Sequence, residues 1–413
     1  MLAGSPGRRA LLPLIPMALV AAAFWPLARP IEGVGDAFQF WFAGHLVATG
    51  RSPYDQSAWG VAGSTYGPPA ANVALSCVDP NAGTCVWVYP PATAWLFAPF
   101  GVADVNLGVS GVDAFVVVTA FVGVVAAVVM FGPSGDGVRA LVLMIAVASH
   151  PFVYDIHAGH FVGLELLGLV GITRGLRERR VWPLVLGVLA LSLKPHLFVV
   201  LVPVVVVALV ARRCWRSIAL SAAALFVLVI AGAIAEPEAF SAILERASTK
   251  AALTWSTPWA LAQVLAPAAP LMVLGALVGL AATAAIGVFR MAPRDDRELA
   301  LISAGMALSL AVTPYAQPYD LLLLVPVIAF AARGAANAPA APRAVLLAAV
   351  LLLYVGGTWF PLFATRLWDD GNRTLGLVPV LALALAATAW LAAGRPPWRL
   401  FRHAAHQAAR PAA

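Results

Sequence analysis

The chain has 413 residues, of which 62% are hydrophobic and 11% are charged. Soluble globular chains are about 45–50% apolar and about 25% charged, so this composition excludes a soluble enzyme, a disordered scaffold and a disulfide-stapled secreted domain. It predicts an all-α, polytopic membrane protein. The net charge of +7 comes from 26 Lys and Arg residues against 19 Asp and Glu, and their positions are more informative than their sum.

Apolar segments recur along the whole chain. A membrane helix needs about 20 apolar residues. The first segment follows Arg8 and Arg9 as a signal peptide would, but no clean small-x-small cleavage site follows it, so we expect a retained helix. The sequence predicts about twelve helices, over 10–28, 108–132, 139–154, 161–175, 181–193, 197–211, 216–234, 266–290, 298–313, 319–333, 343–360 and 374–394. These form one transmembrane domain over 1–398, with a cytoplasmic tail over 399–413.

The basic residues predict the orientation in the membrane, because cytoplasmic loops carry an excess of Lys and Arg. Placing their clusters inside puts 19 of the 26 basic residues on the cytoplasmic side, together with both termini. The clusters lie at 8–9, 174–180, 212–216, 290–297, 333–343 and 395–410. The first outer loop, 30–107, is then long, and it contains a short element over 92–103 that enters the membrane without crossing it.

Asp36 begins an aromatic-rich segment of this first outer loop. Apolar side chains recur there at helical spacing and predict a surface helix on the outer leaflet that stops at Gly50; its members are Phe38, Trp41, Phe42 and His45. Asp36 has two interpretations that are compatible with each other. It can cap this helix, with Gln39 completing a capping-box variant, or it can act as a general base at the membrane surface.

Two of the three cysteines, Cys77 and Cys85, lie close together in the same outer loop. An oxidising compartment makes a small disulfide loop between them plausible. Two free thiols are the alternative. The third cysteine, Cys214, lies among cytoplasmic arginines.

Lys194, Pro195 and His196 stand at the apex of a 31-residue apolar hairpin over 181–211. Each arm is too short to cross a bilayer of about 30 Å, so we expect Lys194 to lie below the outer surface and to face a cavity. A charge at such depth is costly and is a functional hypothesis by default. A lipid phosphate would offset the cost, whereas the alternative is a Lys that snorkels to the headgroups.

Three further outer segments carry polar groups. His157 and His160 have the spacing of a metal pair but lack an obvious third ligand, so structural or substrate-contacting histidines are favoured. A proline-broken segment over 313–320 is either a tight turn or the lining of a cavity; it offers Tyr315, Gln317, Tyr319 and Asp320. Motifs for nucleotides, Asp-x-Asp metal sites and structural zinc are absent, so no metal and no cofactor is expected.

Taken together, these motifs resemble the polytopic GT-C glycosyltransferases of the DUF2029/GT87 type. The resemblance covers about 35–326 and rests on short motifs in the right order: Gly35-Asp36, Gly50-Arg51-Ser52-Pro53-Tyr54, Val88-Tyr89-Pro90-Pro91 with Pro99, Gly159-His160, Lys194-Pro195-His196, Thr313-Pro314-Tyr315 and Tyr319-Asp320. His160 and His196 stand where the family commonly has Gln. Gln317 and Tyr319 stand where other branches carry Trp and His.

The resemblance implies an inverting transfer of a sugar, often mannose, from a polyprenyl-phosphate donor. The acceptor is a hydroxyl of a glycolipid or glycan at the outer face of the plasma membrane. Asp36 is then the general base, which takes the proton of the acceptor hydroxyl. Substrate contacts are expected from Lys194, His196, His160, His45, Tyr89, Tyr315, Gln317, Tyr319 and Asp320, with Lys194 the first candidate for the phosphate.

Two other functions explain part of the same pattern. A lipid or glycan transporter would also bury polar residues, but across the full depth of the bilayer, whereas here they gather in the outer half. A non-catalytic membrane assembly or binding protein is the third interpretation. No nucleic-acid partner is expected.

Overall fold

The computed structural model describes residues 36–66, 87, 89–241, 243, 256–364 and 373–394. Within them the chain is helical and no strand is formed, which confirms the predicted all-α fold. In chain order the elements are α3 (Asp36–Ala48), α4 (Gln56–Tyr66), α6 (Pro91–Gly101), α7 (Val105–Phe131), α8 (Asp136–Ala148), α9 (His150–Ala158), α10 (Val162–Glu178), α11 (Val181–Leu191), η1 (Pro195–Phe198), α12 (Leu201–Ala211), α13 (Trp215–Ala235), α15 (Pro258–Leu265), α16 (Pro270–Met291), η3 (Arg294–Asp296), α17 (Arg297–Val312), η4 (Pro318–Leu324), α18 (Val325–Ala336), α19 (Ala340–Leu351), η5 (Leu352–Gly356), α20 (Gly357–Ala364), η6 (Leu375–Leu377) and α22 (Val378–Ala392).

Six helical stretches in the described residues are long and apolar enough to cross a membrane. They are Val105–Phe131, Trp215–Ala235, Pro270–Met291, Pro318–Ala336, Ala340–Pro361 and Leu375–Ala392. The pair α8 and α9 makes a seventh if it is one span, bent by 50° at its break. The predicted number was about twelve. The difference lies in the first segment, which is outside the described residues, and in shorter helices such as α11 and α12, which have 11 residues each.

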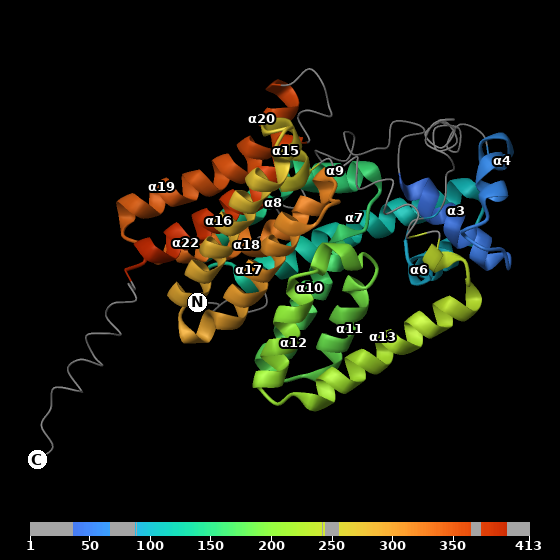
Figure 1. The fold of residues 1–413 in the computed structure, drawn as a ribbon, viewed down its shortest axis with the longest axis horizontal. Helices are drawn as coiled ribbons and strands as arrows, with labels where there is room; N and C mark the ends of the chain where they lie inside the picture. The colour runs from blue at the N-terminus through green and yellow to red at the C-terminus, as the bar shows by residue number, and fades with distance from the viewer. Residues whose placement is uncertain are drawn as a thin grey trace, which may run out of the picture.

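The main core lies where α7, α10, α17, α18 and α22 pack together (Figure 1). These helices are apolar on almost every side, as expected of helices inside a membrane bundle. Close helix approach depends on glycine at one crossing: a Cβ at Gly163 of α10 would lie 2.3 Å from the backbone nitrogen of Ala120 in α7. Small residues at such crossings let the backbones of two helices approach closely. This matters in a membrane, where the hydrophobic effect does not drive helices together.

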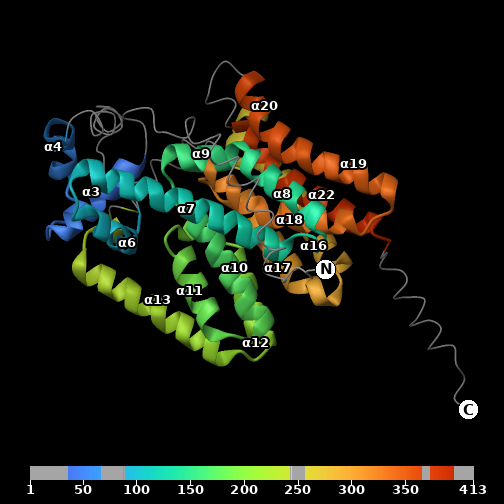
Figure 2. The same ribbon diagram turned by 180° about the vertical axis from the view of Figure 1, so that it is seen from behind.

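The helices α3, α4 and α6, from the segment that the sequence assigns to the first outer loop, form a second core beside the start of α7 (Figures 1 and 2). The helix predicted from Asp36 is present and ends before Gly50, whose φ of +73° is the left-handed conformation of a helix stop. Its predicted apolar face packs within the protein, however, since Phe38, Trp41 and Phe42 are 3%, 1% and 3% exposed; its position on the outer leaflet stays a prediction. Phe40, Trp41 and Ala43 are all buried, because α6 and α7 cover faces that the apolar spacing alone did not count.

The helix α6 is the short element expected over 92–103. Its 11 residues extend about 16 Å, too little to cross the hydrocarbon core. It packs tightly on α3, since Cβ atoms at Gly44 or Gly101 would meet the partner's backbone at 2.3 Å and 2.2 Å. His45 strengthens this contact, because its Nδ1 lies 2.8 Å from the carbonyl oxygen of Gly101.

Arginine-bearing turns meet at one end of the bundle. Arg212, after α12, donates to the carbonyl oxygen of Leu176 in α10 and pairs with Glu298 of α17. Arg333 of α18 pairs with Asp296 at 2.7 Å. Turns that the sequence assigned to one side of the membrane are therefore neighbours in space. The opposite ends of α10, α11 and α17 carry the polar residues described next.

Candidate active site

Five segments far apart in the chain bring their polar side chains together at this opposite end. Asp36 begins α3, Tyr89 precedes α6, His160 lies in the turn between α9 and α10, and Lys194 follows α11. Asp320, from η4 after α17, completes the cluster. All five were predicted as site residues, and the structure places them within reach of one another.

Lys194 and Asp320 form the most deeply buried part of the cluster. Lys194 Nζ donates to Asp320 Oδ1 at 2.8 Å, and the two side chains are only 3% and 1% exposed. Asp320 also accepts a hydrogen bond from the backbone N–H of Gln317 at 2.8 Å. The ammonium lies over the rings of Tyr319 and Phe161, at 4.8 Å and 5.2 Å from their centres. Lys194 is therefore buried, and its charge is compensated within the protein; its depth below the outer surface of the membrane stays a prediction.

His160 connects this buried pair to the more open part of the cluster. Its Nδ1 lies 2.9 Å from Lys194 Nζ, and its Nε2 lies 2.8 Å from the hydroxyl of Tyr89. The ring stacks on Tyr319, with 4.0 Å between the centres. Burial lowers the pKa of His160 well below its ordinary value, and the charge of Lys194 lowers it further, so the ring is neutral at pH 7.

Asp36 is the most open charged group of the five. Its side chain is 28% exposed, and its Oδ2 lies 3.6 Å from His160 Nε2. That separation exceeds the usual 2.7–3.2 Å of an N–H···O hydrogen bond, so the two groups face each other without a short bond. Tyr89 stands beside them. Burial first, and then the charge of Asp36, raise the pKa of Tyr89, so that its phenol keeps its proton.

Gly159 brings this turn against the start of α3. Its φ is +72°, and a Cβ there would lie 2.7 Å from Cβ of Ala37 and 2.8 Å from the backbone nitrogen of the same residue. Only glycine fits both the left-handed conformation and the close approach. The contact fixes Asp36, the neighbour of Ala37, beside His160.

The segment over 313–320 encloses the cluster from the side of α17. Its Gln317 Nε2 donates to the hydroxyl of Tyr315 at 3.1 Å. Burial raises the pKa of Tyr315, and the charges of Asp320 and Asp36 contribute to the rise. Tyr319 stacks on His160 as described. Much of the segment is therefore buried around polar groups, and it does not line the cavity described below.

Two predicted residues stand apart from the five. His196 lies near Tyr315, with 5.7 Å between the ring centres, and its buried Nε2 has no hydrogen-bond partner within the described part of the chain. His45 lies at the far end of α3 from Asp36, about 13 Å away at 1.5 Å per residue, where it holds α6. Cys77 and Cys85 lie outside the described residues.

Two buried carboxyl groups beside the cluster were not among the predicted site residues. Asp155 Oδ1 accepts from the backbone N–H of Val162 at 3.3 Å, and Glu165 is wholly buried in the first turn of α10. Both lie within electrostatic reach of Lys194. Glu165 could have been found from the sequence, because it is a single Glu inside an apolar helix and a charge at membrane depth is costly.

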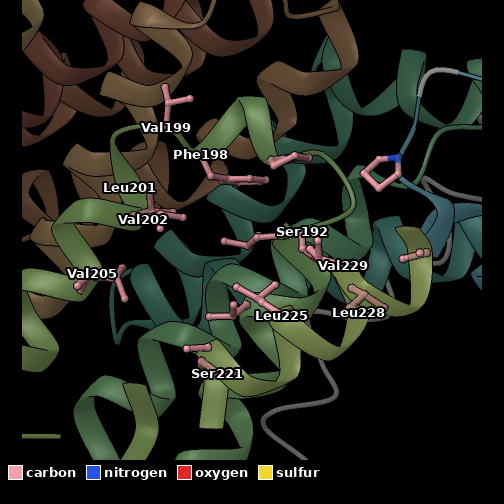
Figure 3. A pocket seen from close by; sticks show the side chains of 18 of the residues that line it. Ser192, Phe198, Val199, Leu201, Val202, Val205, Ser221, Leu225, Leu228 and Val229 are labelled. Carbon is pink, nitrogen blue, oxygen red and sulfur yellow. The ribbon is translucent and has the colours of Figure 1, made fainter. Parts of the chain in front are cut away.

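A large apolar cavity adjoins the cluster. It has a volume of about 790 Å³, within the usual range of ligand pockets, and lies between α10, α11, α12 and α13. Figure 3 shows Leu201, Val202 and Val205 of α12 and Leu225, Leu228 and Val229 of α13 around this space. Its lining includes Pro90, next to Tyr89, and Pro195, between Lys194 and His196.

The helix α13 closes the cavity on its outer side. Figures 1 and 2 show it running from the end of α12 towards α6, outside the main bundle. Its last turn is tied to the first outer segment, because Ser52 donates a hydrogen bond to the carboxylate of Glu236, which also lines the cavity. Two residues further on, the Tyr54 hydroxyl donates to the carbonyl oxygen of Tyr89 at 2.6 Å. The cavity wall and the polar cluster are thus structurally connected.

Within the described residues, no three His, Cys, Asp or Glu side chains are grouped so that they could hold a metal ion. The functional groups that the site offers are a partly exposed carboxylate, a buried cation, neutral imidazoles and phenols. A carboxylate can take a proton from a hydroxyl, and cationic or N–H groups can stabilise an anionic leaving group.

Comparison with known proteins agrees with this chemistry. The model of glycosyltransferase family 87 matches residues 87–314, more than half of the chain. The match includes Tyr89, His160 and Lys194, whereas Asp36 and Asp320 lie outside it. No curated protein and no solved structure matches the chain. With its helical membrane architecture, the chain therefore belongs to glycosyltransferase family 87 and is a membrane glycosyltransferase.

Proposed function

We propose that the protein transfers a sugar, with mannose the first candidate, from a polyprenyl-phosphate donor to a hydroxyl of a glycolipid or glycan. The reaction takes place at the outer face of the plasma membrane. The observation that carries the proposal is the adjacency of the 790 Å³ apolar cavity to the polar cluster. A donor with a long isoprenoid chain and a charged head needs both environments side by side.

The lipid chain of the donor occupies the cavity between α11, α12 and α13. Its walls are aliphatic, and the chain would be shielded from water there at a gain of about 25 cal/mol per Å² of apolar surface buried. The phosphate then lies near Pro90 and Pro195, which are part of the cavity lining. This geometry favours a lipid-linked donor over a water-soluble nucleotide sugar.

The leaving phosphate needs compensation of its charge. His196 follows Pro195, which lines the cavity, and its buried Nε2 lacks a partner in the described residues, so it is our candidate to donate to a phosphate oxygen. Behind it, Lys194 supplies the positive end of the buried Lys194–Asp320 ion pair, in surroundings where a low dielectric strengthens electrostatic effects. The phosphate contact predicted for Lys194 is retained here as an electrostatic one, because its hydrogen bonds go to Asp320 and His160.

Asp36 is the general base. Its carboxylate is partly exposed, so an acceptor hydroxyl can reach it, and it lies 3.6 Å from Nε2 of His160, the atom that also contacts the Tyr89 hydroxyl. Asp36 takes the hydroxyl proton while the acceptor oxygen attacks the anomeric carbon and the bond to the phosphate oxygen breaks. Direct displacement inverts the anomeric centre.

The test uses purified protein with polyprenyl-phosphate-mannose and a membrane glycolipid extract. Wild type, Asp36→Asn and Asp55→Asn are compared. Asp55 is a matched control, because it is also a carboxylate of the first outer segment but is paired with Arg51 outside the cluster. We expect transfer by wild type and Asp55→Asn, and a loss of about 10²–10⁴-fold in Asp36→Asn. Near-normal turnover by Asp36→Asn would remove Asp36 as the base.

If wild type transfers no sugar from polyprenyl-phosphate-mannose, a second experiment follows. Other polyprenyl-phosphate sugars are then offered to the same three proteins. Transfer from one of them would correct the sugar and keep the reaction class. Failure with all of them, together with movement of a lipid-linked sugar across vesicles containing the protein, would replace the proposal with the transporter interpretation.

A further inference from the structure

The buried pair Lys194–Asp320 is connected to the more open part of the site through His160. The Lys194 side chain is 3% exposed, and its Nζ lies 2.9 Å from His160 Nδ1. On the other side of the ring, Nε2 is 2.8 Å from the Tyr89 hydroxyl and 3.6 Å from the Asp36 carboxylate. The imidazole is therefore the physical link between a buried charge and the group that meets the acceptor.

The donors around Nδ1 determine which ring nitrogen carries the proton. An ammonium has three N–H donors and no lone pair, so Nδ1 must accept from Lys194. The backbone N–H of Phe161 points at the same atom, at 3.2 Å. With two donors on one side, the neutral ring keeps its proton on Nε2. The bond from Lys194 is the stronger of the two, because hydrogen bonds with an ionised donor are about twice as strong as neutral ones.

We propose that Lys194, held by Asp320, is a positioning residue that fixes His160 in its Nε2–H form, so that this N–H is presented to Tyr89 and to the Asp36 carboxylate. The inference rests on the proposed function for the role of Asp36, and it assigns the buried pair a task in the same site. The opposite form of the ring would present a lone pair to the carboxylate, at a distance where the two would repel each other.

The arrangement also orients Tyr89. Because Nε2–H donates to the phenol oxygen, the phenol proton is not used in this hydrogen bond and can be donated to another acceptor. Asp320 contributes by holding Lys194 in place, and it is itself held by the backbone N–H of Gln317. No proton needs to move along this chain of contacts during the reaction. Its task is to orient the donors before the acceptor arrives.

A double-mutant cycle separates this task from a purely electrostatic one. The first change, Lys194→Met with Asp320→Asn, removes both charges together, so that no unpaired charge is left buried. The second change, His160→Gln, keeps an N–H donor at about the position of Nε2, and an amide, unlike an imidazole, cannot lose this N–H by a tautomeric shift. The four proteins of the cycle are wild type, the charge-removed protein, His160→Gln and the combination.

The expected result is coupling in kcat. With His160 present, removal of the pair lowers kcat by about 10- to 100-fold, as expected for a lost hydrogen bond to a charged group. With Gln at position 160, the same removal has a much smaller effect. The charge of Lys194 acts on the phosphate in both backgrounds, so only the positioning contribution appears as coupling. Equal losses in both backgrounds would overturn the proposal.

A second measurement does not depend on transfer at all. Protein labelled with ¹⁵N at its seven histidines is reconstituted in lipid, and His160 is assigned by the signals that disappear in His160→Gln. We expect the Nε2–H form in wild type and a shift towards Nδ1–H when Lys194 and Asp320 are replaced. An Nδ1–H ring in wild type, or an unchanged spectrum after the replacement, contradicts the proposal even if the sugar donor has been misidentified. Absence of transfer with the expected spectrum would instead contradict the proposed function alone.

Discussion

Lys194 and Asp320 are 126 positions apart in the chain, and they form an ion pair with 2.8 Å between Nζ and Oδ1. The desolvation of two charges at this depth is costly, and the attraction between them largely offsets that cost. Removal of one partner leaves the other charge buried without compensation, whereas removal of both does not.

The first prediction concerns this pair. Lys194→Met alone should lower the free energy of unfolding by about 3–5 kcal/mol, because Asp320 would lose its compensating charge. Lys194→Met combined with Asp320→Asn should recover most of that loss. Unfolding of both proteins in the same detergent measures the difference. A double variant that is less stable than the single one would show that the pair is not the main electrostatic interaction at this depth.

The second prediction uses Gly159. Gly159→Ala should cost about 1–2 kcal/mol for the left-handed backbone alone, and its Cβ would press on Ala37 at 2.7 Å. Displacement of Ala37 moves Asp36 away from His160, so kcat should fall by at least about tenfold. Gly50→Ala is the matched control, since its φ is +73° but no atom lies within 4 Å of the new Cβ. It should lose stability with kcat unchanged. Equal kcat in the two variants would contradict the prediction.

The third prediction concerns pH. Burial and the charge of Lys194 keep the pKa of His160 well below 6.5, the ordinary value that holds in the unfolded chain. Below pH 6.5 the unfolded state takes up a proton that the folded state does not, so stability is fully present above this pH and falls as the pH drops. His160→Gln removes this contribution, up to about 1.4 kcal/mol per pH unit. Unfolding of both proteins between pH 7.5 and 5 measures it, and parallel curves would contradict it.

The sequence predicted the parts of the fold that depend on local pattern. The helix after Asp36, its stop at Gly50 and the burial of Lys194 follow from spacing, from glycine and from the length of the apolar arms. The covering of α3 on several sides was not predictable in this way, because it depends on Gly44 and Gly101 meeting across two helices. A hydrophobic face shows that a helix is covered, but it does not show how many neighbours cover it.

The candidate site shows the same limit. Asp36, His160 and Lys194 could be selected as residues because each is a polar group in an apolar setting. Which of these residues pair could not be predicted from the sequence, since the partner of Lys194 is Asp320, which lies in a different hairpin. His45 was selected on the same grounds, but its Nδ1 bonds to Gly101 between α3 and α6. A motif selects residues by type, whereas the packing of distant helices decides which of them meet.

The last prediction tests the apolar cavity as the site of the donor's lipid chain. Leu225 of α13 lines the cavity, so Leu225→Trp should fill part of it and raise KM for a long-chain polyprenyl-phosphate sugar by about tenfold, equivalent to ~1.4 kcal/mol of lost apolar contact. A donor with only two isoprene units reaches less far into the cavity and should be affected much less. Val227→Trp is the control, because Val227 is on the same helix, is 65% exposed and is not part of the cavity lining; it should leave KM for both donors unchanged. If Leu225→Trp raises KM equally for long and short donors, or if Val227→Trp has the same effect, the lipid chain lies elsewhere and the cavity serves another purpose.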